Sequence, residues 1–401
     1  MAAAVALPVA LISIAKILLF LGGAAILVLQ KNEDSALSNL PRLKRTSIVI
    51  SVALLAFAIS LAWTTAPMPE ALNALGKYGK LLMIPLIVGL LRSRREALSA
   101  LGVFAVAQIF LLLSSWMLFF GLPVPWATSQ TAVTRYAAFS SYLDQGLMSA
   151  VLAGLCWYLR SFLPSRFWQP LAIAVMLLAL GNVFFIFNGR TGHLAAIAIL
   201  SLAVMWQLPP KARLTVVLLP FVLLLAVSAV SPKVQSRLRL AAQEVQVFSF
   251  QRGANLTSDI SSTGIRLHLW HRAVQSIAES PLAGSGVGSW TSEFDRLEVA
   301  HATKPQKVGE LGNPHQEYLQ WGVQLGLPGM MLLAALLLSL VRDSITMEGK
   351  AAHAVQSVLA ALAVACMFNS VIFDALIGDF FCVTLGLLLA LGLHPKEPEN
   401  A

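Results

Sequence analysis

The sequence contains little charge. Asp, Glu, Lys and Arg make up 12% of its 401 residues, whereas 57% of the residues are hydrophobic and the mean hydropathy is +0.76. Soluble globular domains carry about 25% charged residues, so this composition excludes a water-soluble domain and indicates a membrane protein. The long apolar runs do not alternate with polar residues, which excludes barrel strands and favours transmembrane helices.

Cysteine and metal-binding motifs are also scarce. The three cysteines, Cys156, Cys366 and Cys382, all lie inside apolar segments, which predicts neither a disulfide nor a cysteine-based metal site. The chain has no His-Glu-x-x-His motif and no dense carboxylate cluster, so no metal ion or other cofactor is expected. The glycine-rich segment Gly284–Gly288 neither follows a strand nor ends in Gly-Lys-Ser, so it supports neither a P-loop nor a dinucleotide site.

Long apolar segments are abundant instead. A membrane-spanning helix needs about 20 mostly apolar residues. Eleven candidate spans are present: Val5–Leu29, Thr46–Trp63, Ala71–Leu91, Leu98–Phe120, Leu147–Leu163, Leu171–Phe187, Leu194–Leu208, Leu214–Val230, Tyr318–Val341, Ala354–Phe373 and Phe380–Leu393. We therefore predict an all-α polytopic membrane protein that forms a single membrane domain over residues 1–401. The first segment lacks a basic n-region, so we expect an uncleaved span and not a signal peptide.

The net charge of +9 comes mainly from the ends of alternate connections between these spans. Because Lys and Arg in short loops stay in the cytoplasm, this charge predicts topology and not nucleic-acid binding. The loop over residues 231–316, between the eighth and ninth spans, then faces outward. A single first span gives eleven crossings, and a re-entrant hairpin broken near Lys16 or Gly22 gives twelve.

The outward loop has the composition of a folded segment. It contains Trp270, Trp290 and charges of both signs, which is not the composition of a disordered linker. Its stretch Gly264–Ser280 places Ile265, Leu269, Ala273 and Ile277 on one helical face. We expect this amphipathic helix to fold against the membrane bundle.

The segment Gly312–Tyr318 leads from this loop into an apolar helix. Asn313 suits the N-cap, Pro314 suits the first helical position, and Gln316 completes a capping-box-like pattern. His315 is then expected in the first turn at the outer membrane surface, where the helix dipole favours a neutral imidazole that can accept a proton. His315 is the candidate general base, and a histidine that merely caps the helix is the alternative.

Positive residues on the outward side are few and are candidates for binding an anion. Arg190 lies in a turn between two spans, Arg266 on the amphipathic helix, and Arg135 in the loop after the fourth span. Lys77 and Lys80 lie near the outer end of the third span. Arginine suits phosphate, and several cations around one hollow suit a diphosphate. A solvated or snorkelling charge is the alternative for each one.

Two carboxylates, Asp374 and Asp379, flank the last outward turn. They either pair with these cations or are ordinary turn residues, and the sequence does not distinguish the two roles.

Three groups of motifs occur in the second half of the chain. They are Gly189-Arg190-Thr191-Gly192, then Gly264–Trp270 continuing to Pro281–Gly288, and Pro314–Leu319 followed by Gly326–Gly329. In these segments the chain resembles the O-antigen ligase family of Gram-negative bacteria, which shares a domain with O-antigen polymerases and some protein O-oligosaccharyltransferases. The family usually has Asn where this chain has Gln316, and often Glu where it has Gln324.

The resemblance implies a glycosyltransferase that moves O-antigen polysaccharide from undecaprenyl diphosphate to a sugar hydroxyl of the lipid A core, without metal or nucleotide. Its location would be the bacterial inner membrane, with the active site facing the periplasm and with membrane lipids as neighbours. It implies His315 as the base, Arg190 and Arg266 as diphosphate ligands, and Arg135, Lys77 and Lys80 as second-line cations. Direct displacement would invert the anomeric carbon.

Other activities use the same residues. A polymerase takes a second lipid-linked glycan as acceptor, and a protein O-oligosaccharyltransferase takes a protein. A transporter of lipid-linked glycan would place charges at the midplane of broken helices and would show repeat symmetry; neither is evident in the sequence. The oligomeric state is left open.

Overall fold

The computed structural model describes residues 1–29, 43–163, 165–232, 234–236, 239–240, 242, 262–301, 312–347 and 349–394. Over these residues every regular element is a helix. Eight of the described segments are long and apolar enough to cross a membrane. The prediction of an all-α polytopic membrane protein is therefore confirmed.

Each of the eleven predicted spans falls on a helix. The corresponding helices are α1 (Val9–Leu29), α2 (Lys44–Ile59), α3 with α4 (Met68–Tyr78, Met83–Leu90), α5 (Arg94–Phe119), α6 (Tyr142–Leu159), α7 (Trp168–Gly181), α8 (Arg190–Met205), α9 (Leu219–Val230), α13 (Glu317–Ile345), α14 (Gly349–Phe368) and α15 (Ala375–Leu393). Short turns extend or join several of them: η1 (Ala4–Ala6), η3 (Ser60–Ala62), η4 (Gly79–Leu82), η5 (Arg160–Phe162), η6 (Asn182–Ile186) and η7 (Pro210–Leu218).

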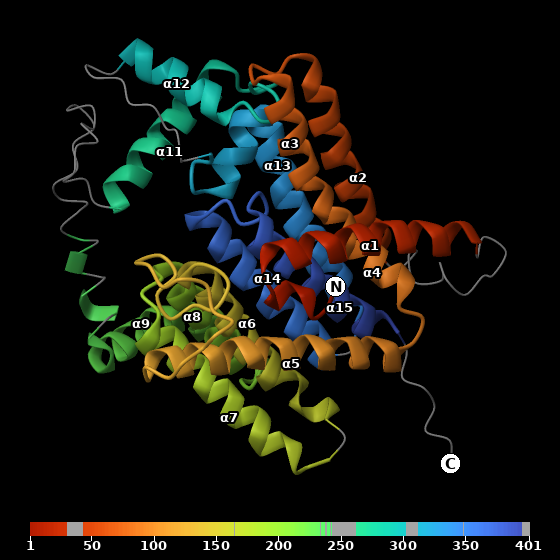
Figure 1. Cartoon of the computed structure of the whole chain (residues 1–401), viewed down its shortest axis with the longest axis vertical. Coiled ribbons are helices and arrows are strands. Elements are labelled where there is room, and N and C mark those ends of the chain that lie inside the picture. The colour runs from red at the N-terminus through yellow and green to blue at the C-terminus, as the bar shows by residue number, and fades with distance from the viewer. Residues whose placement is uncertain are drawn as a thin grey trace.

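The first segment is one helix and not a hairpin. Helix α1 continues through Lys16 and Gly22 without a break, so the alternative of a hairpin broken near either residue is wrong. Only 11% of its apolar window is buried, because α1 lies at the periphery of the bundle (Figure 1). The ammonium group of Lys16 lies 2.7 Å from a carboxylate oxygen of Asp379, and this ion pair joins α1 to α15.

Helix α15 lies at the centre of the bundle. Its apolar window is 94% buried, and it packs against α4, α5 and α14. Because lipid and solvent are excluded from it, its polar residues depend on other protein groups for hydrogen bonds. The connection between α14 and α15 therefore has a fixed environment.

Helices α11 (Ser262–Glu279) and α12 (Trp290–His301) lie together at one end of the molecule, beside α3 and α13 (Figure 1). The predicted amphipathic face is confirmed, because Leu269, Ala273 and Ile277 are buried in one cluster with Trp290 and residues of α13. The rest of the predicted outward loop, residues 243–261 and 302–311, lies outside the described residues.

The glycine loop, residues Gly284–Gly288, connects α11 to α12 and docks on two other elements. Backbone N–H groups of this loop donate to the Val323 and Gln324 carbonyls, the Gln324 side chain and the Ser60 hydroxyl, at 2.8–3.0 Å. Gly284, Gly286 and Gly288 all have positive φ angles. The loop is therefore a structural joint whose N–H groups are directed at the protein and not at a ligand.

A substitution in this loop tests its tight fit. At Gly286, where φ is +87°, an added Cβ would lie 2.6 Å from Thr64 Cβ. We expect Gly286→Ala to lower the free energy of unfolding by about 2–5 kcal/mol, from the left-handed backbone and overpacking together. The measurement is the thermal midpoint in detergent. Gly102→Ala is the control, because a Cβ there meets nothing within 4 Å; equal midpoints for the two variants would contradict the expectation.

Candidate functional site

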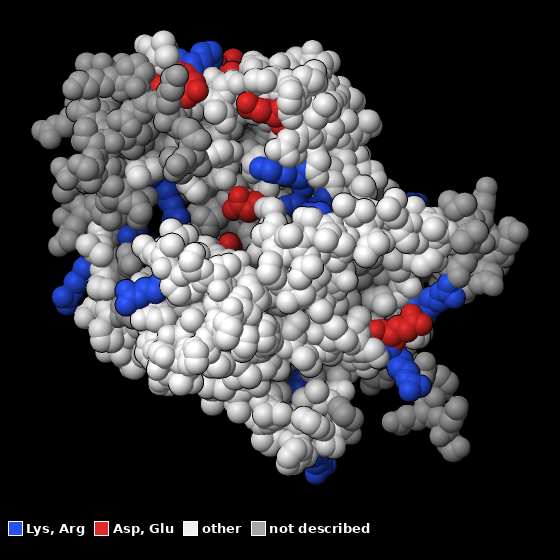
Figure 2. Space-filling view, viewed as in Figure 1, with Lys and Arg blue, Asp and Glu red and all other residues white. Residues whose placement is uncertain are grey.

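The connection Asn369–Asp374, which we call the α14–α15 turn, is the meeting point of the candidate site. Groups from α11, from α3 and η4, and from the segment that opens α13 all contact it. Figure 2 shows a hollow beside α3 in which positive and negative side chains lie close together. The contacts of this turn define which charged groups are held near one another.

Glu317, the first residue of α13, binds the backbone of the turn. One of its carboxylate oxygens accepts the N–H groups of Ile372 at 2.8 Å and Phe373 at 3.2 Å. The other oxygen accepts the indole N–H of Trp321 at 2.9 Å. The side chain is 0% exposed, so this carboxylate joins α13 to the α14–α15 turn.

Arg266 of α11 reaches the opposite end of the same turn. Its guanidinium donates to the side-chain carbonyl of Asn369 at 3.4 Å, and the contact is partly buried. The guanidinium group presents a planar fork of donors, which suits a phosphate group.

Lys77 and Lys80 approach the turn from α3 and η4. The Lys77 ammonium group lies 4.0 Å from the ring centroid of Phe373. The Lys80 ammonium group donates to the carbonyl oxygens of Asp374 and Ala375, and Lys80 is only 2% exposed. Lys80 is thus committed to the backbone of the turn, whereas Lys77 is half-buried.

His315 lies in the segment just before α13, and here the predicted helix start is wrong. Helix α13 begins at Glu317 with Gln316 as its N-cap, whose side chain accepts the Leu319 N–H at 2.6 Å. Asn313 instead accepts the N–H of His315 at 2.9 Å and donates to Asp374 at 3.4 Å. His315 has φ +52°, a left-handed conformation that is rare for a side-chain-bearing residue and typical of functional sites.

The imidazole of His315 is half-buried and close to a positive charge. Burial lowers the pKa of His315 from its usual 6.5 to about 4, and the nearby Arg266 guanidinium adds to this effect. The imidazole is therefore neutral at physiological pH and can accept a proton. The structure thus holds His315 and Arg266 within electrostatic reach of each other.

The pKa of the Asp374 carboxyl group is shifted upward, whereas that of His315 is shifted downward. Burial raises the pKa of the Asp374 carboxyl to about 6, with a further increase from Asp144 and an opposing effect of Lys80 and Lys77. Asp374 is therefore not an ordinary turn carboxylate. Asp379, the second carboxylate in question, pairs with Lys16 and not with a predicted site cation.

The first turns of α6 and α8 meet at this end of the bundle. An added Cβ at Gly192 of α8 would lie 3.1 Å from the Gly146 carbonyl carbon of α6, so the two helices pack closely there. Asp144 is in the first turn of α6, and half-buried Arg190 is the first residue of α8. Because the charge of Asp144 acts on Asp374, the N-termini of α6, α8 and α15 converge, and such ends favour anions.

Arg135 lies elsewhere. It is exposed, its guanidinium lies 5.0 Å from the ring centroid of Tyr136, and it donates to the Tyr136 hydroxyl at 3.2 Å. Both contacts are within its own loop, so they do not bring Arg135 to the α14–α15 turn.

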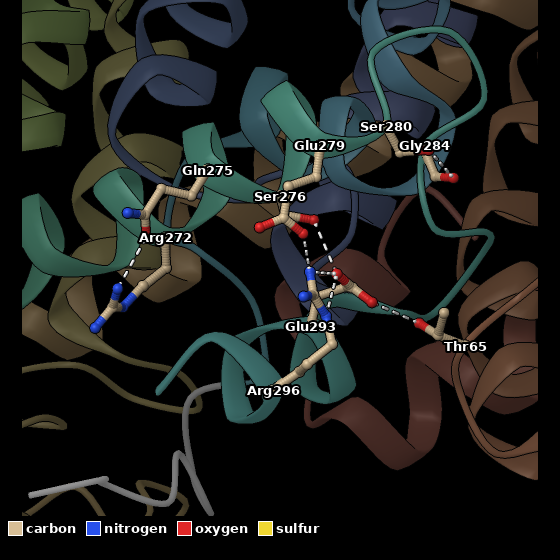
Figure 3. A network of polar contacts seen from close by, with 9 residues as sticks. All are labelled: Thr65, Arg272, Gln275, Ser276, Glu279, Ser280, Gly284, Glu293 and Arg296. Carbon is tan, nitrogen blue, oxygen red and sulfur yellow. Dashed lines mark hydrogen bonds and ion pairs between the residues drawn. The ribbon is translucent and has the colours of Figure 1, made fainter. Parts of the chain in front are cut away.

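A polar network fixes α12 against α11 and against the connection between η3 and α3 (Figure 3). Glu293 of α12 accepts hydrogen bonds from the hydroxyls of Thr65 at 3.1 Å and Ser276 at 3.3 Å. The Arg296 guanidinium lies 2.8 Å from the same carboxylate and also pairs with Glu279. These contacts anchor the helix pair to the rest of the protein.

A second network lies on α11 close to Arg266. Glu298 of α12 receives the Arg272 guanidinium at 2.6 Å and contacts the His268 imidazole at 2.8 Å, and all three residues are buried. Removing one partner of a buried ion pair strongly destabilises a protein, because the other charge is left buried without a partner. Arg266 is therefore carried by a helix whose position is fixed by ion pairs as well as by apolar packing.

The fold and the site define a class: a multi-pass helical membrane protein in which a neutral histidine and several cations lie near one turn. Residues 174–334 match the family model of the O-antigen ligases. Residues 174–334 thus carry an O-antigen ligase domain, and members of that family are glycosyltransferase-like ligases. The predicted resemblance is confirmed. No curated protein matches the chain.

The matched residues hold Arg190, Arg266 and His315, whereas the α14–α15 turn lies beyond them. Glu317 and Asn369 were not predicted as site residues. Glu317 directly precedes the predicted span Tyr318–Val341, so the rule that a charged residue inside a membrane segment indicates function did not apply to it. Asn369 lies near the end of the predicted span Ala354–Phe373, and no motif included it.

Asp374→Asn tests the electrostatics of the site. Because the folded-state pKa of about 6 lies above the ordinary 3.8, ionising Asp374 weakens the folded state above pH 6, and the penalty disappears as pH falls toward 4. We expect the Asn variant to be about 1–3 kcal/mol more stable at pH 8, with the difference shrinking toward pH 4. The measurement is the thermal midpoint in detergent across this pH range.

Asp379→Asn is the matched control on the same helix. It breaks the ion pair with Lys16, so it should lower the midpoint at pH 8. A lower midpoint at pH 8 for Asp374→Asn as well would contradict the expected electrostatics.

Proposed function

We propose that the protein is an O-antigen ligase. It transfers a glycan from undecaprenyl diphosphate to a sugar hydroxyl of the lipid A core, at the periplasmic face of the bacterial inner membrane. The observation that carries the proposal is that the α14–α15 turn holds Arg266, Lys77 and the segment of His315 together. A base and the cations for a departing diphosphate are thus neighbours.

The chemistry needs little else. The acceptor hydroxyl attacks the anomeric carbon while the bond from that carbon to the diphosphate oxygen breaks, and the electron pair leaves with the diphosphate. His315 takes the hydroxyl proton, and Arg266 and Arg190 hold the departing charge. One displacement inverts the anomeric carbon. A product with the configuration of the donor would overturn this step.

The low pKa of His315 fits an ordered reaction. In the protein without substrate, burial and, to a lesser extent, the neighbouring Arg266 lower the pKa of His315 and keep the imidazole neutral and weakly basic. A bound diphosphate places negative charge beside both groups, and negative charge raises the pKa of an imidazole. The base therefore becomes stronger when the donor is in place.

The ranking of the cations follows from their burial. Arg266 is half-buried at the turn, Lys80 is nearly fully buried on two carbonyls, and Arg135 is exposed in its own loop. We propose that Arg266 contacts the diphosphate together with Arg190. Lys77 and Lys80 add positive potential, and Arg135 contributes least.

His315→Ala tests the base. Base assistance is typically worth about 10² to 10⁴ in rate, so we expect a loss of that size with normal expression. Purified protein is given lipid-linked glycan and lipid A core with a chelator present, and transfer is followed on a gel. His353→Ala is the control, since His353 stacks on Trp206 at 4.1 Å, outside the site.

Each product has a distinct meaning. Transfer to the core by wild type and by His353→Ala, but not by His315→Ala, supports the ligase. Elongation of the lipid-linked glycan identifies a polymerase, and a glycosylated protein identifies a protein O-oligosaccharyltransferase. Full activity of His315→Ala would exclude the base role.

Arg266→Lys tests the diphosphate contact. Lysine keeps the charge but loses the planar fork, and a hydrogen bond to a charged group contributes about 1.5–3 kcal/mol. We expect KM for the lipid-linked donor to rise about 10- to 100-fold, whereas Arg135→Lys should change it about threefold or less. Steady-state kinetics with varied donor measures both. Equal increases would contradict the ranking.

A further inference from the structure

The carboxylate of Glu317 is saturated with hydrogen bonds and shielded from solvent. It accepts the N–H groups of Ile372 and Phe373 on one oxygen and the Trp321 indole N–H on the other, at 2.8–3.2 Å. Glu317 is 0% exposed. A group in this position cannot touch a substrate, so a direct role in proton transfer is excluded.

Glu317 nevertheless lies between the two halves of the site. It follows His315 by two residues at the start of α13. The turn it binds carries Asn369, the partner of Arg266, and Asp374, the partner of Asn313. The hydrogen bonds of this carboxylate thus set the position of the base relative to the cation.

Burying a charged group is unfavourable unless donors surround it. An apolar side chain at position 317 would pack on Trp321, but it would leave two N–H groups of the turn without acceptors. Because the turn is buried non-helical backbone, those N–H groups need an acceptor from the protein.

We propose that Glu317 is a positioning residue that fixes the separation of His315 and Arg266 by holding the α14–α15 turn against the start of α13. The effect on glycan transfer rests on the proposed function, whereas the effect on geometry does not. The alternative is a purely structural carboxylate whose loss lowers the amount of folded protein and nothing else.

Glu317→Gln is the sharpest substitution. If the amide oxygen accepts the two backbone N–H groups, the amide N–H₂ faces the Trp321 indole N–H, which is a donor against a donor. The reverse orientation places the N–H₂ against the backbone donors. Removing the indole donor with Trp321→Phe should therefore restore part of the geometry in the double variant.

The readout is the environment of His315 itself. Diethyl pyrocarbonate acylates neutral imidazole, and peptide mass spectrometry reports modification at His315 alone as pH is varied. Burial and Arg266 of α11 act on this imidazole. Asp374, at the start of α15, is linked through Asn313 to the backbone N–H of His315. If the turn moves away, water enters and Arg266 shifts, so the midpoint of reactivity rises from near 4 toward 6.5.

Asp343→Asn is the matched control. Asp343 is a second buried carboxylate on α13, and it accepts the backbone N–H and the hydroxyl of Thr46 at 3.1 and 2.7 Å. It lies 26 residues along the chain from Glu317, beyond the non-helical backbone of Gly326 inside α13. Asp343→Asn should lower the stability of the protein without changing the midpoint of His315 reactivity.

We expect Glu317→Gln to raise the His315 midpoint and to lower kcat/KM per folded protein by about 10²-fold, the size reported for small misplacements of reacting groups. In the Trp321→Phe background, Glu317→Gln should have a smaller effect on the His315 midpoint and on kcat/KM than it has in the wild type. The Trp321→Phe single variant is the reference for this comparison. If Glu317→Gln does not fold, Glu317→Asp takes its place. This substitution withdraws the carboxylate by one methylene, so the His315 midpoint should lie between the wild-type value and 6.5.

Two results would overturn the inference. One is an unchanged His315 midpoint in folded Glu317→Gln and Glu317→Asp. The other is an equal shift in Asp343→Asn, which would indicate general loosening. If wild type transfers no glycan while the midpoint still shifts with Glu317, the proposed function fails and the positioning role stands.

Discussion

The constraint on which the site depends is that buried backbone must be hydrogen-bonded. The α14–α15 turn lies between two helices inside the bundle, and the N–H groups of Ile372 and Phe373 need an acceptor from outside those helices. Glu317 satisfies the N–H groups of Ile372 and Phe373, and Lys80 satisfies the carbonyls of Asp374 and Ala375. Glu317 and Lys80 lie here because the backbone of the turn needs an acceptor and a donor. Their charges contribute to the electrostatic potential in the hollow beside the turn.

Lys80 and Arg266 differ in how far a ligand can approach them. Lys80 is committed to the turn, and an added Cβ at Gly378 would lie 2.8 Å from its ammonium group, so the absence of a side chain at Gly378 makes room for it. Arg266 contacts the side chain of Asn369 and is half-buried. A half-buried guanidinium can be reached by an incoming anion, whereas a buried ammonium group that donates to carbonyls acts only through its field.

Much of the fold was predictable, because apolar runs and helical periodicity are local properties. The spans and the buried face of α11 followed from them, and the motifs around Arg190, Arg266 and His315 identified the family. The start of α13 was not predictable from local rules: Asn313 and Gln316 are both capping residues, and the choice depends on Asp374, which lies 61 residues away and binds Asn313. The partners Lys16 and Asp379 are separated by 363 residues, and no local pattern joins them.

The glycine loop shows how one composition serves two purposes. A phosphate cradle and a tight structural joint both need backbone without side chains, so Gly284–Gly288 alone does not distinguish them. Here the loop N–H groups are directed at α13 and at Ser60, which fixes α11 to the same helix that begins beside His315. Glu317 joins that helix to the α14–α15 turn. The elements that carry Arg266 and His315 are thus both attached to the first part of α13, before the break at Gly326, by two independent sets of contacts. A reaction sensitive to the separation of base and leaving group requires such fixed positions.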